Sequence, residues 1–528
     1  MAQVLLLGDE ALAQGALDAG LSGCFAYPGT PSTEIMEYVQ GSALAKERGV
    51  HREWSANEKT AMEEGLGMSF AGKRAMVCMK HVGMNVCADG FVNSVVTGSR
   101  GGLLVVAADD PSMHSSQNEQ DSRFYAKFAM TACFEPSNQQ EVYELPKRAF
   151  EFSEKFEVPV LVRMTMRLSH SRANVEVGQA APIPAPVTAD PKDRHFVLLP
   201  AIAMKNYAKL CEKQAALVEA SENSPYNVLT DGADKSLGVI ACGIGYNYVQ
   251  EVFGGKCPYP ILKIGQYPLP KKQIRKLMDE CDKILVVEEG MPMVEEMLRG
   301  PLDSEKILGR LSGQLPRCGE LNPFTVAKAF GLEPKVPNGL SELVKNRPPR
   351  LCDGCPHADS YKAILAAIAD KPGARVFGDI GCYTLGALPP YGAISSCVDM
   401  GASITMAKGA SDAGIAPAIA VIGDSTFTHS GMTGLLDAVW ENSPITVMIL
   451  DNDTTGMTGG QSSMGAGRME KICAGLGVEP AHIRILTPLP KNHETNVQAV
   501  QEELAYQGVS VVIFRRECIQ ALKHKKKG

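Results

Sequence analysis

Two oxygen-bearing side chains near the C-terminal end are spaced as a metal site would require. Asp424 ends the apolar run PAIAVIGD, and Asn452 ends the run ITVMILDN, 28 positions later. Carboxylate and amide oxygens suit Mg²⁺, which takes few protein oxygens and completes its shell with phosphate groups and water. The pair therefore predicts a site for Mg²⁺ and a phosphate-bearing ligand. An ordinary strand–helix–strand unit with an Asp and an Asn in its turns is the alternative.

A strand–helix–strand unit would bring these two side chains together. Both apolar runs are rich in β-branched residues, and the stretch GMTGLLDAVWEN between them has a helical pattern. A crossover between parallel strands is right-handed and returns the chain to the same edge of the sheet. Ligands of open α/β sheets bind at that edge, beyond the carboxyl ends of the strands.

The stretch HREWSANEKTAMEEGLGMSF contains carboxylates that could act on a proton. Its candidates are Glu58, Glu63 and Glu64. Glu58 follows Ser-Ala-Asn at the start of the helical pattern, where capping chemistry is expected. Glu63 and Glu64 lie a turn or more further on and could face solvent. Glu58 is the best placed of the three, and a first-turn acid that complements the helix dipole is the more common interpretation of such a residue.

Two further segments of the first 100 residues carry candidate polar groups. In YPGTPSTE, Pro31 is expected at the first helical position and Thr30 at the cap, where its hydroxyl could help to bind a carboxylate. Lys80 and His81 follow the apolar run RAMVCM, so they are expected at a sheet edge. A lysine there could attract an anion and His81 could move a proton, and a surface turn is the alternative.

Four cysteines do not resemble core thiols. Cys352 and Cys355 form a Cys-x-x-Cys pair in LCDGCPH, Cys382 follows a predicted strand, and Cys518 follows the last one. Zinc with His357 as a ligand, a redox pair and an iron–sulfur cluster are all compatible with the pair alone. Four thiolates are the ligand set of a 4Fe–4S cluster, and the positions of Cys382 and Cys518 after predicted strands favour that interpretation.

Bulk properties exclude several classes of function. The chain has 528 residues, 45% hydrophobic and 21% charged residues, and a net charge of −7, so nucleic acid is not an expected partner. No apolar run reaches membrane-spanning length, and the N-terminus does not resemble a signal peptide. Fifteen cysteines without a targeting signal favour a reducing, cytoplasmic location over a disulfide framework.

Strands and helices alternate in three blocks, joined by Pro-rich links. We expect domains at residues 1–178, 196–335 and 351–528, with links at 179–195 and 336–350. Alternation of this kind predicts a doubly wound parallel sheet in each domain. The acids in VVEEG, residues 286–290, are expected to be exposed at a strand end.

Seven motifs in register carry a family resemblance that covers nearly all of the chain. In order they are AYPGTPSTEI, NEKTA with MKHVGMN, DDPSMHSSQNEQDSR, LCDGCPH, GDIGCYTLG, GDSTFTHSG and DNDTTGMTGGQSS. Together they resemble the large subunit of indolepyruvate:ferredoxin oxidoreductases, of the thiamine diphosphate-dependent 2-oxoacid:ferredoxin oxidoreductase superfamily. The resemblance implies a pyrimidine-binding domain, a transketolase C-terminal-like domain and a diphosphate-binding domain.

The resemblance also implies cofactors and site residues. The cofactors are thiamine diphosphate, Mg²⁺ and one 4Fe–4S cluster, with coenzyme A as co-substrate. Glu58 would activate the aminopyrimidine ring, Thr30 would contact the 2-oxoacid, and His81 would assist catalysis. The other implied residues are those for the cofactor (Gly381, Tyr383, Gly423, Asp424, Ser425, Asn452 and Thr454), those for Mg²⁺ (Asp424, Asn452 and the carbonyl of Thr454), and those for the cluster (Cys352, Cys355, Cys382 and Cys518).

Members of that family act with partners. The resemblance implies a small beta subunit, ferredoxin or another electron carrier, and a homodimer of this subunit within a heterotetramer or larger assembly. The family's large subunit continues into a ferredoxin-like domain with further cysteine runs, whereas this sequence ends ten residues after Cys518. Electrons are therefore expected to leave through another protein.

Two other functions remain open at this point. A non-oxidative thiamine diphosphate decarboxylase or carboligase would need Glu58, Asp424 and Asn452 but not the four cysteines. A non-catalytic scaffold with the same fold would need none of them.

Overall fold

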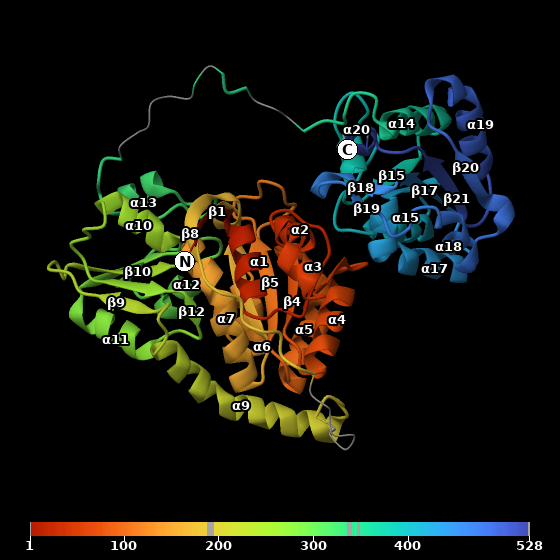
Figure 1. Ribbon diagram of the computed structural model, residues 1–528. Coiled ribbons are helices and arrows are strands. Elements are labelled where there is room, and N and C mark those ends of the chain that lie inside the picture. Colours follow the sequence, from red (N-terminus) through yellow and green to blue (C-terminus); the bar gives the residue numbers. More distant parts are fainter. Residues whose placement is uncertain (1, 187–194, 335–340, 342, 346–348, 526–528) are drawn as a thin grey trace. The chain divides into compact units, whose positions relative to one another are not determined.

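The computed structural model describes residues 2–186, 195–334, 341, 343–345 and 349–525. It forms two compact units, Met1–Gly339 and Leu340–Gly528 (Figure 1). The first unit holds the first two predicted blocks and the second holds the third. The predicted links lie partly outside the described residues, and the domain boundaries stay a prediction.

A seven-stranded sheet forms the centre of the first unit. Its strand order is β12-β6-β7-β5-β4-β2-β3, and all neighbours are parallel except β12 and β6. The strands are β2 (Gly23–Ala26), β3 (His51–Trp54), β4 (Ala75–Lys80), β5 (Leu103–Asp109), β6 (Cys133–Phe134), β7 (Val160–Thr165) and β12 (Gln266–Tyr267). The predicted strands that became β2, β4, β5 and β7 are confirmed.

Helices cover both faces of this sheet. Successive side chains of a strand point to opposite faces, and here both sets are apolar and need to be buried. Met76 and Cys78 of β4 belong to one core, with residues of α1, α2 and α7, and Ala75 and Val77 belong to the other, with residues of α4 and α5. Both faces of these strands are therefore buried, which explains their continuous apolar sequences. The helices are α1 (Gly8–Asp18), α2 (Thr33–Gly41), α3 (Ala43–Glu47), α4 (Glu58–Phe70), α5 (His81–Thr97), α6 (Arg123–Ala129), α7 (Gln139–Phe156) and α8 (Met166–His170).

A second sheet in the first unit has the order β14-β13-β10-β11-β9, with β9 antiparallel at its edge. Its strands are β9 (Val228–Thr230), β10 (Leu237–Cys242), β11 (Ile261–Ile264), β13 (Lys283–Val287) and β14 (Ile307–Leu308). The segment YPILKIGQYP, predicted as one strand, is divided: β11 stays in this sheet, and β12 joins the seven-stranded sheet. The two sheets thus share their hydrophobic cores. The helices here are α9 (Pro200–Glu222), α10 (Gly245–Phe253), α11 (Lys271–Glu280), α12 (Met293–Arg299) and α13 (Pro323–Ala329).

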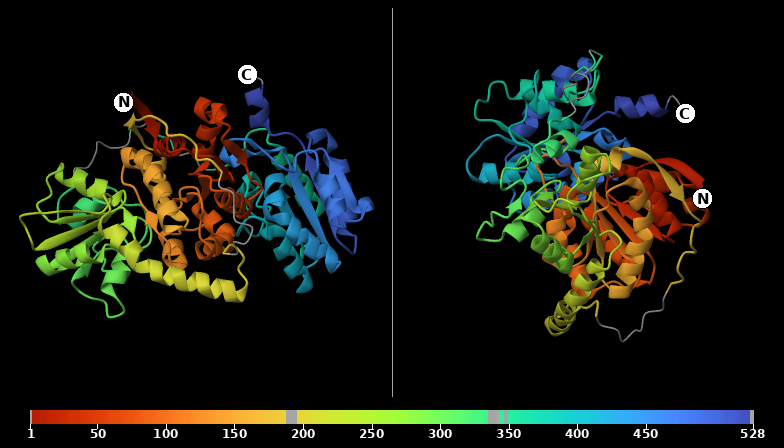
Figure 2. Two further views of the ribbon diagram at one scale, coloured as in Figure 1. Left: turned by 60° about the horizontal axis from the view of Figure 1, so that its bottom comes forward. Right: turned by 90° about the vertical axis from the view of Figure 1, so that its left-hand side faces the viewer.

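Two elements connect distant parts of the first unit. β1 (Ala2–Leu7) pairs antiparallel with β8 (Arg172–Val177), so the chain start is tied to the end of the first block. The long helix α9, yellow in Figure 1 and in the left view of Figure 2, contacts α5 at one end and β12 and α11 at the other.

Glu288 and Glu289 correct the expectation of exposed acids. Both are buried, at 1% exposure. Glu288 pairs with Arg123 at 2.9 Å, and Glu289 pairs with Arg310 at 3.4 Å. A buried carboxylate requires such partners, and they come from segments far away in the sequence.

The second unit contains a five-stranded parallel sheet of order β15-β16-β17-β21-β20. α14 and α19 pack on one face, and α15, α17 and α18 on the other. The elements are α14 (Pro356–Ala367), β15 (Arg375–Gly378), η1 (Cys382–Ala387), α15 (Ala402–Asp412), β16 (Ala418–Gly423), α16 (Asp424–Thr426), η2 (Phe427–Gly431), α17 (Met432–Trp440), β17 (Ile445–Asp451), the hairpin β18 (Thr454–Thr455) and β19 (Gln461–Ser462), η3 (Gly456–Thr458), α18 (Met469–Gly475), η4 (Pro480–His482), β20 (Ile483–Leu486), η5 (Pro490–Asn492), α19 (His493–Leu504), β21 (Ser510–Arg515) and α20 (Ile519–Lys525). The doubly wound α/β class is confirmed, with antiparallel strands added at sheet edges of the first unit.

Two further findings concern membrane-spanning helices and disulfides. Within the described residues, no helix has both the length and the apolar composition needed to cross a membrane. All fifteen cysteines are free thiols, and no disulfide joins the segments that the structure describes.

Candidate active site

Asp424 and Asn452 lie at the same edge of the second unit's sheet, as the sequence predicts. Asp424 directly follows β16, Asn452 directly follows β17, and the two strands are parallel neighbours. Both side chains are buried, with exposures of 3% and 6%. The edge where α/β sheets bind their ligands thus carries one carboxylate and one amide from adjacent strands.

The burial and the hydrogen bonding of the Asp424 carboxylate are those expected of a cation ligand. Its Oδ2 is buried and has no hydrogen-bond partner. Burial, reinforced by the nearby carboxylate of Asp451, raises the pKa of Asp424 to about 8. A buried carboxylate oxygen without a partner is unfavourable unless a proton or a cation compensates it, and carboxylate oxygens are the type that Mg²⁺ binds.

The segment after β17 folds back over this edge. The Thr454 backbone N–H donates to Asn452 Oδ1 at 3.2 Å, and Thr454 Oγ1 donates to the Gln461 carbonyl across the β18–β19 hairpin. Thr455 Oγ1 donates to Ser425 Oγ at 2.9 Å, which ties the hairpin to the segment after β16. The residues predicted for the metal and the diphosphate, Asp424, Ser425, Asn452 and Thr454, are therefore brought together.

Gly381 and Gly423 make room for the Tyr383 ring. A Cβ added at Gly381 or at Gly423 would lie 2.3 or 2.6 Å from Tyr383 Cε1, so neither position admits a side chain without rearrangement. The Tyr383 hydroxyl donates to Asp379 Oδ1, and Ser403 Oγ donates to Asp379 Oδ2 at 2.6 Å. Burial raises the pKa of Asp379 to about 6. Sequence reasoning did not single out Asp379, because an acid at a strand end is common.

Three of the four candidate cluster cysteines are tied to the carboxyl edge of the sheet. Cys355 directly precedes α14, Cys382 is the first residue of η1 after β15, and the backbone N–H of Cys518 donates to the Asn452 carbonyl at 3.1 Å. Cys352 is exposed, and its Sγ accepts a hydrogen bond from Gln520 Nε2 at 3.5 Å. Gln520 lies two residues after Cys518.

Cys352, Cys355 and Cys518 lie near enough to Cys382 to affect its pKa. Burial, with smaller contributions from Cys355, Cys518 and Cys352, raises the pKa of Cys382 to about 12. Thiolates that raise one another's pKa need positive charge to stay deprotonated, and iron–sulfur clusters are bound through thiolates. The donor set therefore fits a 4Fe–4S cluster.

The zinc interpretation of Cys-x-x-Cys-Pro-His gains no support. Ligands around a tetrahedral zinc lie about 3–4 Å from one another, given bonds of about 2.0–2.3 Å. Across the described ranges, the single group of three His, Cys, Asp or Glu ligand atoms within 4.8 Å of one another is Asp9, Glu34 and His170. His357 Nε2 instead faces Asn452 Nδ2 at 3.1 Å, and burial lowers the pKa of His357 to about 4.

Glu58 is the buried member of its three candidates. It is the first residue of α4, where Asn57 caps the helix by accepting from the Thr60 N–H at 2.8 Å. Its exposure is 5%, whereas Glu63 and Glu64 are exposed. The Glu58 side chain lies against Gly83 of α5: a Cβ there would be 2.7 Å from Glu58 Cγ and 2.8 Å from Oε1.

Lys80 and His81 are buried, so the surface-turn alternative is wrong. They stand at the junction of β4 and α5, and His81 Nε2 lies 3.3 Å from the Asn118 carbonyl. Lys80 Nζ donates to the Ser115 carbonyl at 2.7 Å. Burial lowers the pKa of Lys80 to about 8, opposed by the negative charge of Asp110.

Thr30 is not the helix cap that the sequence predicts. α2 begins at Thr33 and its cap is Ser32, because a turn intervenes in which Ser32 Oγ donates to the Gly29 carbonyl at 2.7 Å. Thr30 is half-buried within that turn, after β2. A Cβ at Gly29 would lie 3.1 Å from Lys80 Cβ, so the Thr30 turn packs against the end of β4.

Sequence reasoning missed Asp9. Asp9 is fully buried near the start of α1, and its ligand atom lies within 4.8 Å of those of Glu34 and His170. Neither Asp9 oxygen has a partner of good hydrogen-bond geometry, although the Ser169 hydroxyl is close enough to lower its pKa. Burial dominates and raises the pKa of Asp9 to about 8. First-turn acids are too common for the sequence to mark this one.

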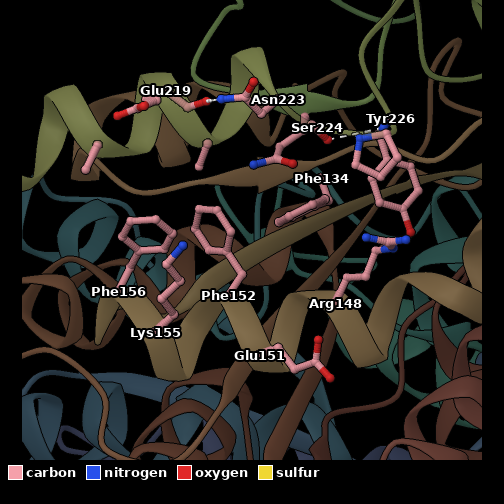
Figure 3. Close-up of a pocket in the computed structure, with 14 residues that line it drawn as sticks. Phe134, Arg148, Glu151, Phe152, Lys155, Phe156, Glu219, Asn223, Ser224 and Tyr226 are labelled. Atoms are coloured by element: carbon pink, nitrogen blue, oxygen red, sulfur yellow. Dashed lines mark hydrogen bonds between the residues drawn. The ribbon is translucent and has the colours of Figure 1, made fainter.

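A separate cavity of about 570 Å³ lies between α7 and α9 of the first unit (Figure 3). Aromatic side chains including Phe152 and Tyr226 line it, and Arg148 and Lys155 contribute its cationic groups. No residue predicted for the site is among those that line it.

Family models identify the class. Residues 379–514 match the thiamine pyrophosphate enzyme C-terminal TPP-binding domain, and residues 14–207 match the thiamine diphosphate-binding domain of pyruvate flavodoxin/ferredoxin oxidoreductases. Together with the α/β fold, they define a thiamine diphosphate-dependent 2-oxoacid oxidoreductase.

Full-length relatives narrow the class to one family. The chain is 39% identical to the indolepyruvate oxidoreductase subunit IorA of Archaeoglobus fulgidus, over 98% of this chain and 86% of the relative. It is 37% identical to the IorA subunit of Thermococcus kodakarensis, with the same coverage. The chain belongs to the indolepyruvate oxidoreductase subunit IorA family.

A solved structure supports the fold alone. The 2-oxoglutarate:ferredoxin oxidoreductase from Magnetococcus marinus matches with a TM-score of 0.51 at 17% identity, covering 62% of this chain and 65% of that chain.

Proposed function

We propose that this chain is the catalytic subunit of an enzyme that oxidatively decarboxylates aryl 2-oxoacids such as indolepyruvate to acyl-CoA. The observation that supports it most is the 36–39% identity to several IorA subunits over 98% of the chain. The structure adds a carboxylate, an amide and four cysteines in the second unit that fit Mg²⁺ and a 4Fe–4S cluster.

Each group has a proposed role. Asp424, Asn452 and the Thr454 carbonyl hold Mg²⁺. Gly381, Gly423 and Ser425 bind the diphosphate, and the Tyr383 ring packs against both glycines. Cys352, Cys355, Cys382 and Cys518 hold the cluster. When bound, thiamine diphosphate supplies a nucleophilic carbon and an electron sink, and the cluster accepts single electrons.

In the first unit, side chains of the protein transfer protons and bind the substrate carboxylate. Glu58, kept against Gly83, holds a proton for the aminopyrimidine ring. The Thr30 hydroxyl contacts the 2-oxoacid, and His81, in its buried position beside the Asn118 carbonyl, assists a proton transfer. Lys80, at the end of β4, adds a positive charge for the substrate carboxylate.

The subunit acts with partners in this proposal. The name IorA denotes one subunit of an oligomeric enzyme, so we expect a small beta subunit, and ferredoxin or another carrier as electron acceptor. A homodimer of this chain within a heterotetramer or larger assembly, located in the cytoplasm, completes the proposal.

Anaerobic purification with the beta subunit tests it. We expect a brown protein with four iron atoms per chain, as one cubane cluster requires, and CoA-dependent reduction of an acceptor by indolepyruvate. Cys382→Ser should lose iron but retain thiamine diphosphate, whereas Asp424→Ala should show the opposite pattern. A colourless, iron-free protein that still released CO₂ from 2-oxoacids would replace this proposal with a non-oxidative decarboxylase.

A further inference from the structure

The Asn452 amide is held from both ends. Its Nδ2 lies 3.1 Å from His357 Nε2, and its Oδ1 accepts from the Thr454 backbone N–H at 3.2 Å. Both side chains are buried, with 6% exposure for Asn452 and 3% for His357. His357 comes from the first turn of α14, two residues after Cys355.

These contacts determine which end of the amide faces which neighbour. A backbone N–H can only donate, so the Asn452 atom that faces Thr454 must be the oxygen. The Nδ2 group, which carries only donors, therefore faces His357. His357 Nε2 must then be the acceptor, in the neutral tautomer whose proton lies on Nδ1.

This orientation matters because only one end of an amide can bind a cation. Asn452 Oδ1 has a second lone pair beyond the one used by Thr454, and Nδ2 has none available. If the amide turned over, an NH₂ group would face both the Thr454 N–H and the metal position. The Thr454 N–H and a neutral acceptor at His357 Nε2 therefore favour the same orientation, the one that can bind a metal.

We infer that His357 is a positioning residue that keeps the Asn452 oxygen turned toward the bound Mg²⁺. The inference rests on the proposed function, because it takes Asn452 as a metal ligand. It also gives the histidine of Cys-Pro-His a task that is separate from cluster ligation. The segment that supplies Cys352 and Cys355 would thereby also organise the magnesium site.

Magnesium titration of anaerobically purified protein, in the presence of thiamine diphosphate, tests the inference. We expect His357→Leu to weaken the apparent Mg²⁺ affinity by about 10- to 100-fold, the usual effect of removing a partner that orients a metal ligand. His357→Gln should recover part of the loss, because its amide oxygen can accept from Asn452 Nδ2. Iron content and the melting temperature serve as checks on folding in every variant.

A double-mutant cycle separates orientation from general packing. In Asn452→Asp, both side-chain oxygens can bind the metal, so orientation no longer matters. His357→Leu should then change the Mg²⁺ affinity by less than about threefold in that background, well below the loss expected when an orienting partner is removed. An equal loss in both backgrounds, or no loss in the Asn452 background, would overturn the inference and leave the proposed function standing. A wild-type protein that binds no Mg²⁺ would overturn both.

Discussion

Replacing the buried Asp9 by asparagine should make the protein less sensitive to alkaline pH. Burial is the main reason that the pKa of Asp9 rises from 3.8 to about 8; Glu34 adds to the rise, and Ser169 and His170 oppose it. Neither carboxylate oxygen has a well-formed hydrogen bond. Asparagine has nearly the same shape, carries no charge, and can donate to the neighbouring oxygens.

The sign follows from proton linkage. The folded protein binds the Asp9 proton more tightly than the unfolded chain, so the wild type loses stability as the pH rises from about 4 to about 8. Each pH unit in that window costs about 1.4 kcal/mol, so the wild type should lose about 2–3 kcal/mol relative to Asp9→Asn between pH 6 and pH 8.5. The unfolding entropy is about 2.1 cal/mol/K per residue. For the first unit, Met1–Gly339, the loss of stability therefore corresponds to a difference of about 3–4 °C in melting temperature.

Differential scanning calorimetry at the two pH values measures this difference. Asp89→Asn, at an exposed position on α5, is the matched control and should behave as the wild type at both pH values. If Asp9 were instead ionised and neutralised by a cation shared with Glu34 and His170, Asp9→Asn would lower the melting temperature at both pH values. That result would refute the argument that Asp9 holds a proton.

Two further predictions concern a packing contact, with Gly90→Ala as its control, and a buried ion pair. Gly83→Ala places a methyl group 2.7 Å from Glu58 Cγ and should lower turnover at least about tenfold by displacing the carboxylate, since a shift of about 1 Å can cost 10²-fold. Gly90→Ala on the same helix meets its nearest atom at 3.5 Å and should leave turnover unchanged; equal effects would contradict the packing argument. Arg123→Met removes the cation 2.9 Å from the buried Glu288 and should cost about 3–5 kcal/mol in urea unfolding. A loss below about 1 kcal/mol would mean that Glu288 does not depend on Arg123.

The sequence by itself determined the features that depend on neighbouring residues. β16 and β17 were predictable because both their faces are buried, which demands unbroken apolar runs. Asp424 and Asn452 were predictable at one edge because parallel strands place their carboxyl ends at the same edge of a sheet. The start of α4 at Glu58 followed from the capping preference of Asn57.

Only the tertiary structure decided the features that depend on distant partners. β12 is two residues long and joins a different sheet from β11, a choice that no local period encodes. Glu288 is buried because Arg123, from another block, lies beside it. His357 meets Asn452 across 95 residues of sequence. Periodicity and capping are local properties of a chain, whereas the pairing of charges and the orientation of an amide depend on which segments the folded core brings into contact.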